Sequence, residues 1–92
     1  MRIARFLLGR VVATLGVLTA LEEAGESPGA LLGRHVTGDW GDLDDHDRRE
    51  NEFSVSRDLR ILSAYTLSDG TKIWIITEAD RSATTLLLPS EY

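Results

Sequence analysis

Residues 60–92 read RILSAYTLSDGTKIWIITEADRSATTLLLPSEY. Three short runs in this stretch are rich in β-branched and aromatic residues, and clusters of turn residues separate them. Asp69-Gly70 lies between the first two runs, and Asp-Gly is the strongest short signal for a hairpin closed by a type I′ turn. The second reversal falls within residues 79–82. The stretch therefore predicts a three-stranded antiparallel meander.

The two turns set the register of this meander. A two-residue loop at Asp69-Gly70 places Tyr65 opposite Trp74, and a four-residue loop at 79–82 places Ile75 opposite Leu86. Counting outward from these pairs puts one apolar set on each face of the sheet. The first set, which suits packing against helices, is Leu62, Ala64, Ile73, Ile75, Leu86 and Leu88. The second set is Ile61, Tyr65, Leu67, Trp74, Ile76 and Leu87.

The second face needs a cover, because a sheet that is wet on one side alternates apolar with polar residues. Two alternatives remain open. Either the N-terminal segment or the C-terminal tail of the chain covers this face, or the face meets a partner protein or a second copy of the chain. Large apolar patches mark interfaces, and aromatic residues are their usual anchors. The candidate interaction residues on this face are Tyr65, Trp74, Ile76 and Leu87.

Two helices are predicted in the first half of the chain. Thr14 is expected to cap a helix over residues 15–24, which Gly25 ends. Ser27 and Pro28 open the second helix as its cap and its first helical residue. Since about three residues join the two helices, we expect an antiparallel helical hairpin.

A third, shorter helix is predicted to begin at Asp44 or Asp45 and to end near Phe53 or Ser54. Acidic residues come first in this segment and arginines follow, which is the order that the helix dipole favours. Residues 5–14 favour an additional short strand through two adjacent valines, with an extension of the following helix as the alternative.

The predicted fold class is therefore α+β, in a single domain over residues 1–92. Residues 1–58 form a mainly helical, acidic half, and residues 59–92 form the β-meander. The helical hairpin and the third helix are expected to pack on one face of that meander.

The charge of the chain is unevenly distributed. The net charge is −5, but residues 22–58 contain eleven acidic residues and four arginines, a net charge of −7. Direct binding to nucleic acid is not expected, because it requires a basic face. A dense carboxylate surface can instead imitate nucleic acid and occupy the basic groove of another protein, with ordinary solubility as the competing explanation. The candidate residues of this surface are Asp39, Asp42, Asp44, Asp45, Asp47, Glu50 and Glu52.

No catalytic residue, metal or cofactor is predicted. The acidic run lacks the glycine and glutamate positions of a calcium-binding loop. The chain has no cysteine, and the spacing of His35 and His46 does not indicate zinc. An acid–base site on the sheet, drawn from His46, Arg60, Glu78 and Arg81, remains as the alternative of a small ribonuclease or toxin.

A cytoplasmic location without a membrane partner is expected. The N-terminal arginines and apolar run suggest a signal peptide at first sight, but Arg10 interrupts the run and no small-residue cleavage site follows. The run is also too short and too broken to span a bilayer. The absence of cysteine fits a reducing compartment.

Three stretches carry a resemblance to a known family: LGRVVATLGVLTALEEAGESP, RHVTGDWGDLDDHDRREN and RILSAYTLSDGTKIWIITEADRSATTLLLPSEY. From Leu8 onward the chain resembles small bacterial "plasmid-related" proteins of plasmids and integrative elements, which are often mislabelled as restriction-system subunits. Leu15 stands where that family has a proline. The resemblance implies a mobile-element setting, in which small acidic proteins often inhibit host defence nucleases, and it supplies no catalytic residue.

The predicted function is accordingly a non-enzymatic protein-binding module, of the type that inhibits a host defence nuclease complex by imitating nucleic acid. Its partner would be another protein or a second copy of the chain. A small ribonuclease or toxin and a structural homodimer are the alternatives.

Overall fold

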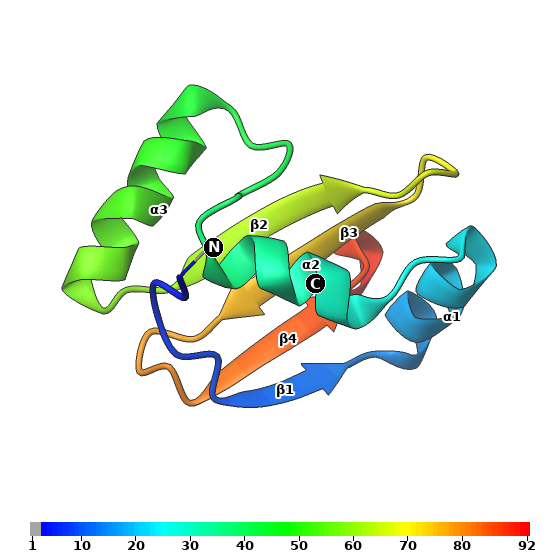
Figure 1. Ribbon diagram of the computed structural model, residues 1–92, viewed down its shortest axis with the longest axis horizontal. Coiled ribbons are helices and arrows are strands. Elements are labelled where there is room, and N and C mark those ends of the chain that lie inside the picture. Colours follow the sequence, from blue (N-terminus) through cyan, green and yellow to red (C-terminus); the bar gives the residue numbers. More distant parts are fainter. Residues whose placement is uncertain (1–2) are drawn as a thin grey trace.

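The computed structural model describes residues 3–92, which form three α-helices and a four-stranded sheet (Figure 1). This arrangement confirms the predicted α+β class. The elements in chain order are β1 (Arg10–Ala13), α1 (Leu15–Ala24), α2 (Pro28–Val36), α3 (Asp45–Arg57), β2 (Ile61–Thr66), β3 (Lys72–Thr77), β4 (Ala83–Leu87) and the 3-10 helix η1 (Pro89–Glu91).

The helices begin where the sequence predicts them. The Thr14 side chain accepts the N–H of Val17 at the start of α1, and the Ser27 side chain accepts the N–H of Ala30 at the start of α2. These bonds satisfy backbone donors that have no partner inside the helix. Gly25 ends α1 in the left-handed region with φ 70°.

The strands are ordered β1-β4-β3-β2. β2, β3 and β4 form the predicted antiparallel meander, and the additional N-terminal strand β1 pairs with β4 in parallel. The sheet is therefore mixed rather than purely antiparallel. The three helices lie between β1 and the meander in the chain. This long connection allows β1 to pair with β4 in parallel, whereas a short hairpin loop would impose antiparallel pairing.

One of the two predicted registers is confirmed and the other is wrong. Ile75 lies opposite Leu86 across β3 and β4, as predicted. Across β2 and β3, however, Tyr65 lies opposite Ile73 instead of Trp74. The slip is one residue, and a slip of one residue moves every side chain of β2 to the other face of the sheet.

The slip arises in the turn at Asp69-Gly70. The N–H of Gly70 donates to the carbonyl of Leu67 at 2.9 Å, and the N–H of Leu67 donates to the carbonyl of Thr71 at 2.8 Å. Residues 68–70 therefore form a three-residue loop in which only the glycine has positive φ, at 91°. A turn followed by a left-handed glycine is the next most common way to close a hairpin, and it replaces the predicted type I′ turn.

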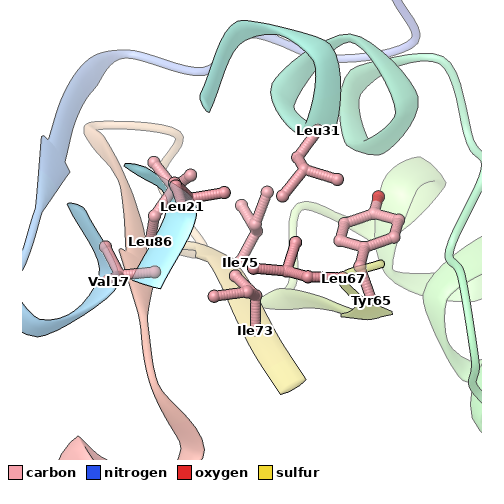
Figure 2. Packing of buried hydrophobic residues seen from close by; sticks show 8 residues of the cluster. All are labelled: Val17, Leu21, Leu31, Tyr65, Leu67, Ile73, Ile75 and Leu86. Carbon is pink, nitrogen blue, oxygen red and sulfur yellow. The ribbon is translucent and has the colours of Figure 1, made fainter. Parts of the chain in front are cut away.

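The corrected register decides what lies in the core. The core faces α1 and α2 and contains Val17, Leu21, Leu31, Tyr65, Leu67, Ile73, Ile75 and Leu86 (Figure 2). Tyr65 is 1% exposed, and its hydroxyl donates to the carbonyl of Asp39 at 2.7 Å. Tyr65 and Leu67 therefore pack under the helices, whereas Leu62 and Ala64 share the opposite face with Trp74.

The chain's own tail lies on that opposite face. The ring of Tyr92 packs edge-on against Trp74 with centroids 5.6 Å apart, and Arg60 donates to the Tyr92 hydroxyl at 2.7 Å. Ile76 and Leu87 are 2% and 6% exposed. Of the four residues proposed from the sequence as contacts on this face, Trp74 alone remains partly open, because Tyr65 points to the other side and the other two are buried.

The third helix does not join the other two on the core face, in contrast to the prediction. α3 lies beside β2, the edge strand, in Figure 1. It carries few apolar residues, so it has no stripe with which to enter the core. Its place depends on polar contacts.

Candidate functional site: the groove between α3 and Trp74

The side-chain amide of Asn51 attaches α3 to the edge strand β2. Asn51 Nδ2 donates to the carbonyl of Leu62 at 2.6 Å, and the N–H of Leu62 donates back to Asn51 Oδ1 at 3.3 Å. The side chain of Asn51 is buried and takes the place that the peptide group of a neighbouring strand would occupy. The edge of β2 is thereby closed at this point.

The loop before α3 covers the same edge at Ala64. The N–H of Ala64 donates to the carbonyl of Trp40 at 3.2 Å, and the N–H of Asp42 donates to the carbonyl of Ala64 at 2.7 Å. The Thr66 hydroxyl donates to Asp42 Oδ2 at 2.6 Å. Open strand edges pair with other chains, and here the loop and Asn51 prevent such pairing at β2.

We expect Asn51→Asp to lower the free energy of unfolding by about 2–3 kcal/mol, because the carboxylate loses the donor to Leu62 and faces that carbonyl with negative charge. Urea unfolding followed by circular dichroism measures the loss. Arg49→Gln, at an exposed position of the same helix, is the control and should change stability by less than about 0.5 kcal/mol. Equal losses in the two variants would contradict a locking role for Asn51.

A groove of about 350 Å³ opens between α3 and the tail-side face of the sheet. Asp47, Glu50 and Asn51 are spaced three and four residues apart, so they share one side of the helix. Trp74 and Leu62 contribute from the sheet. The residues that line the groove are Leu43, Asp47, Glu50, Asn51, Leu62 and Trp74, and none of them is basic.

Two of the predicted acidic residues serve the fold instead of a free surface. Asp39 Oδ2 accepts a hydrogen bond from Arg34 Nε at 2.7 Å, and this ion pair ties the loop to the end of α2. Asp42 accepts the hydroxyl of Thr66, as described above. Asp39 is half-buried, whereas Asp42 is exposed.

Glu52 and Asp44 are engaged as well. Glu52 pairs with Arg5 at 2.7 Å and accepts the Trp40 indole N–H at 2.9 Å. The hydrogen bond from Arg5 holds the pKa of the Glu52 carboxyl below its usual value. Asp44 caps α3 by accepting the N–H of Asp47 at 2.9 Å. Asp45, Asp47 and Glu50 are exposed and accept none of these hydrogen bonds, although Glu50 Oε1 lies 3.9 Å from His46 Nε2. Asp47 and Glu50 line the groove.

A buried polar chain that the sequence did not reveal crosses the core beside α2. His35 is 0% exposed, with Nδ1 2.6 Å from Ser63 Oγ and Nε2 2.8 Å from Thr77 Oγ1. Thr77 Oγ1 lies 2.7 Å from Thr84 Oγ1, whose hydroxyl donates to the carbonyl of Leu8 at 2.7 Å. Because the Thr84 hydroxyl donates its only proton to Leu8, it must accept from Thr77. Thr77 therefore donates to Thr84 and accepts from His35 Nε2–H. Ser63 then donates to Nδ1.

The side chains in this chain of hydrogen bonds, those of His35, Ser63, Thr77 and Thr84, are all 0% exposed, so we assign it a structural role. Burial lowers the pKa of His35 to about 4, so the ring is neutral at pH 7. The hydrogen-bond partners of His35 were not predicted from the sequence. The available signal was the presence of serine and threonine within strands that are otherwise apolar, but their alignment with one histidine required the tertiary structure.

The alternative acid–base residues do not form one site. Arg60 pairs with Glu78 at 3.8 Å. Arg81 Nη2 donates to the carbonyl of Ser54 in the last turns of α3 at 3.0 Å. His46 lies in the first turn of α3, and eight residues of helix place it about 12 Å from Ser54. The contacts of Arg60, Glu78 and Arg81 stabilise the turn between β3 and β4.

Residues 3–92 contain no cluster of three or more side chains arranged to hold a metal ion. Within the same range, no helix has the length and apolar character required to cross a membrane. No protein family, curated protein or solved structure matches this chain. The resemblance to plasmid-related proteins therefore stays a prediction.

Proposed function

We propose that this chain is a non-enzymatic protein-binding module, and that the groove between α3 and Trp74 takes a basic segment of a partner protein. One observation carries the proposal: two exposed carboxylates, Asp47 and Glu50, stand beside a partly open tryptophan over an apolar floor, with no basic residue in the lining.

The chemistry of the groove matches arginine and lysine side chains. Their methylene stems pack on apolar surface while the charged ends stay polar. Here Leu62 and Trp74 offer the apolar surface, and Asp47 and Glu50 offer the opposite charge. The face of an indole adds cation–π attraction. A volume of about 350 Å³ lies at the lower end of the range for small-ligand pockets, which suits one or two side chains.

The class of the partner protein is inferred from the acidic charge around the groove and from the resemblance to plasmid-related proteins. The net charge of −7 over residues 22–58 attracts basic protein surfaces and speeds association with them. A basic groove that normally holds nucleic acid is one such surface. In the mobile-element setting that the resemblance implies, the partner is a host defence nuclease complex, and this chain inhibits it in the cytoplasm.

The proposal is tested with an N-acetylated hexa-arginine peptide, titrated while the fluorescence of the two tryptophans and the indole N–H signals in NMR spectra are recorded. Binding should shift the signal of Trp74 and leave that of the buried Trp40 in place. Combining Asp47→Asn with Glu50→Gln should weaken binding by about 3- to 10-fold, since exposed ion pairs contribute up to about 1 kcal/mol each.

Asp45→Asn is the matched control, because it removes one exposed charge from the same helix outside the groove. It should retain most of the affinity. A hexa-glutamate peptide should not bind. Equal weakening by the groove variant and by Asp45→Asn would show that only the overall charge matters, and that result would remove the groove from the proposal.

A further inference from the structure

The two edges of the sheet differ. At the β2 edge, Asn51 and residues 40–42 occupy the outer hydrogen-bonding groups, as described above. At the opposite edge, no segment of the described chain lies beyond β1 (Figure 1). An open edge is a template for pairing with another strand.

The outer backbone groups of β1 have no partner in the described chain. The backbone N–H of Arg10 donates to the carbonyl of Ser82, just before β4, at 2.9 Å, and that of Thr14 donates to the carbonyl of Leu86 at 3.1 Å. In a parallel ladder every second residue bonds to the same neighbour, so the N–H and C=O groups of Val11 and Ala13 point away from β4. No hydrogen bond to these groups occurs within the described residues.

Exposed apolar side chains are concentrated in the N-terminal segment, and four of them, Val11, Val12, Leu15 and Leu18, belong to β1 and to α1, which directly follows it. Six of the nine exposed large hydrophobic residues in the described chain belong to the segment from residue 3 to residue 18, although that segment is only about a sixth of the chain. Such a concentration marks an interface, whereas isolated exposed apolar residues do not. The six are Ile3, Leu7, Val11, Val12, Leu15 and Leu18.

We propose that β1 pairs antiparallel with β1 of a second copy about a two-fold axis at Val12, which joins the two sheets into one. Val11 of each copy then lies opposite Ala13 of the other, and their free N–H and C=O groups bond to each other. Val12 meets Val12 of the second copy as a non-hydrogen-bonded pair. A closed two-fold dimer is the most common assembly of identical chains.

Charge complementarity favours a second copy over a foreign strand. In this register Arg10 lies opposite Thr14 of the other copy, on the same face of the joined sheet. The Thr14 hydroxyl donates to the Glu91 carboxylate at 2.7 Å, so a carboxylate is already placed where the incoming guanidinium arrives. Arg10 is exposed and forms no ion pair in the described chain. The dimer forms two such Arg10–Glu91 pairs.

The interface is small, so the dimer is expected to be concentration-dependent. Stable interfaces of standard size bury about 1,200–2,000 Å², and a ladder over a four-residue strand with its flanking side chains lies at or below that range. We expect a weak dimer with a Kd on the order of 10–100 µM, because interfaces at the low end of the size range are typically transient.

Sedimentation equilibrium from about 5 µM to 1 mM brackets that Kd and tests the proposal. The wild-type chain should shift from monomer to dimer. Arg10→Glu should weaken the dimer at least tenfold by placing like charges together, and Arg10→Glu combined with Glu91→Lys should restore at least half of the dimer. Trp74→Ala should leave it unchanged. A wild-type chain that stays monomeric, or a dimer that Trp74→Ala abolishes and Arg10→Glu does not, would overturn the proposal.

Cysteine cross-linking tests the register independently, because the chain has no cysteine of its own. Val12→Cys should form a disulfide-linked dimer under mild oxidation, since Cα atoms in a non-hydrogen-bonded antiparallel pair are about 4.5 Å apart. Val11→Cys is the matched control and should cross-link much more slowly. Absence of the Val12→Cys product, or equal rates for the two variants, would overturn the two-fold axis at Val12. The dimer does not depend on the groove, so either proposal can fail alone.

Discussion

Gly41→Ala is expected to lower the free energy of unfolding by about 3–5 kcal/mol. Gly41 has φ 76°, a conformation that L side chains rarely adopt. An added Cβ would lie 1.9 Å from the carbonyl oxygen of Ala64 and 2.6 Å from Tyr65 Cδ1. The loop must then leave the edge of β2, which breaks the hydrogen bonds at Ala64 and loosens the packing of Trp40.

Gly25→Ala is the matched control for this prediction. Gly25 also has positive φ, at 70°, but its added Cβ would meet nothing within 4 Å. Gly25→Ala should therefore lower the free energy of unfolding by the backbone strain alone, about 1 kcal/mol. Urea unfolding monitored by tryptophan fluorescence compares the two variants. Similar losses would mean that the contact of the loop with β2 contributes little to stability.

Lowering the pH from 7 to 4 is expected to reduce the free energy of unfolding by up to about 3 kcal/mol through His35. Burial lowers the pKa of His35 to about 4, from 6.5 in an unfolded chain, so the unfolded state binds the proton first. The stability that this group contributes is complete above about pH 6.5. It falls by up to about 1.4 kcal/mol per pH unit as the pH approaches 4, and the loss stops below the folded pKa.

The hydrogen-bond chain explains why the folded state resists this proton. A charged ring needs an acceptor at Nδ1, but the Ser63 hydroxyl donates there. Thr77 and Thr84 cannot compensate, because Thr77 donates to Thr84 and Thr84 donates to the carbonyl of Leu8. Protonation therefore removes a hydrogen bond in addition to burying a charge. The hydrogen bond from Arg5 lowers the pKa of the Glu52 carboxyl. Glu52 therefore contributes a further loss of folding stability at lower pH, as the pH falls through its folded pKa.

Thermal or urea unfolding at pH 7, 6, 5 and 4 measures this slope. His35→Gln should be less stable at pH 7 and should lack the loss between pH 6.5 and 4.5. His46→Gln, at an exposed position, is the control and should keep the loss. If His35→Gln does not fold, calorimetry of the wild-type chain in two buffers at pH 5.5 should give about one proton taken up on unfolding. No proton uptake at that pH would contradict a neutral, buried His35.

Some of this molecule was open to prediction from residues that are close in sequence. Thr14 and Ser27 bond to N–H groups three positions away, so the pattern of cap and helix is visible in a few letters. The pairing of Ile75 with Leu86 follows from a loop whose length the turn residues indicate. The candidate site was indicated in part, since Asp47, Glu50 and Trp74 were named, but nothing placed them together.

The same local signal failed at the first hairpin. Asp69-Gly70 correctly indicates a reversal, but it is compatible with loops of two or three residues, and these place Tyr65 on opposite faces. The packing of Tyr65 and Leu67 into the core with Ile73 selects the three-residue loop. The neighbouring residues in sequence cannot supply that preference.

By itself, the sequence determined the fold class, the starts of the helices and the second turn of the meander, because each rests on contacts within a few residues. Only the tertiary structure decided the faces of β2, the attachment of α3 through Asn51 and the groove beside Trp74. It also decided the path of the hydrogen bonds from His35 to Thr77, which are 42 residues apart. The physical reason is that hydrogen bonding and burial depend on distance in space, and the partners of these side chains come from strands and helices far along the chain.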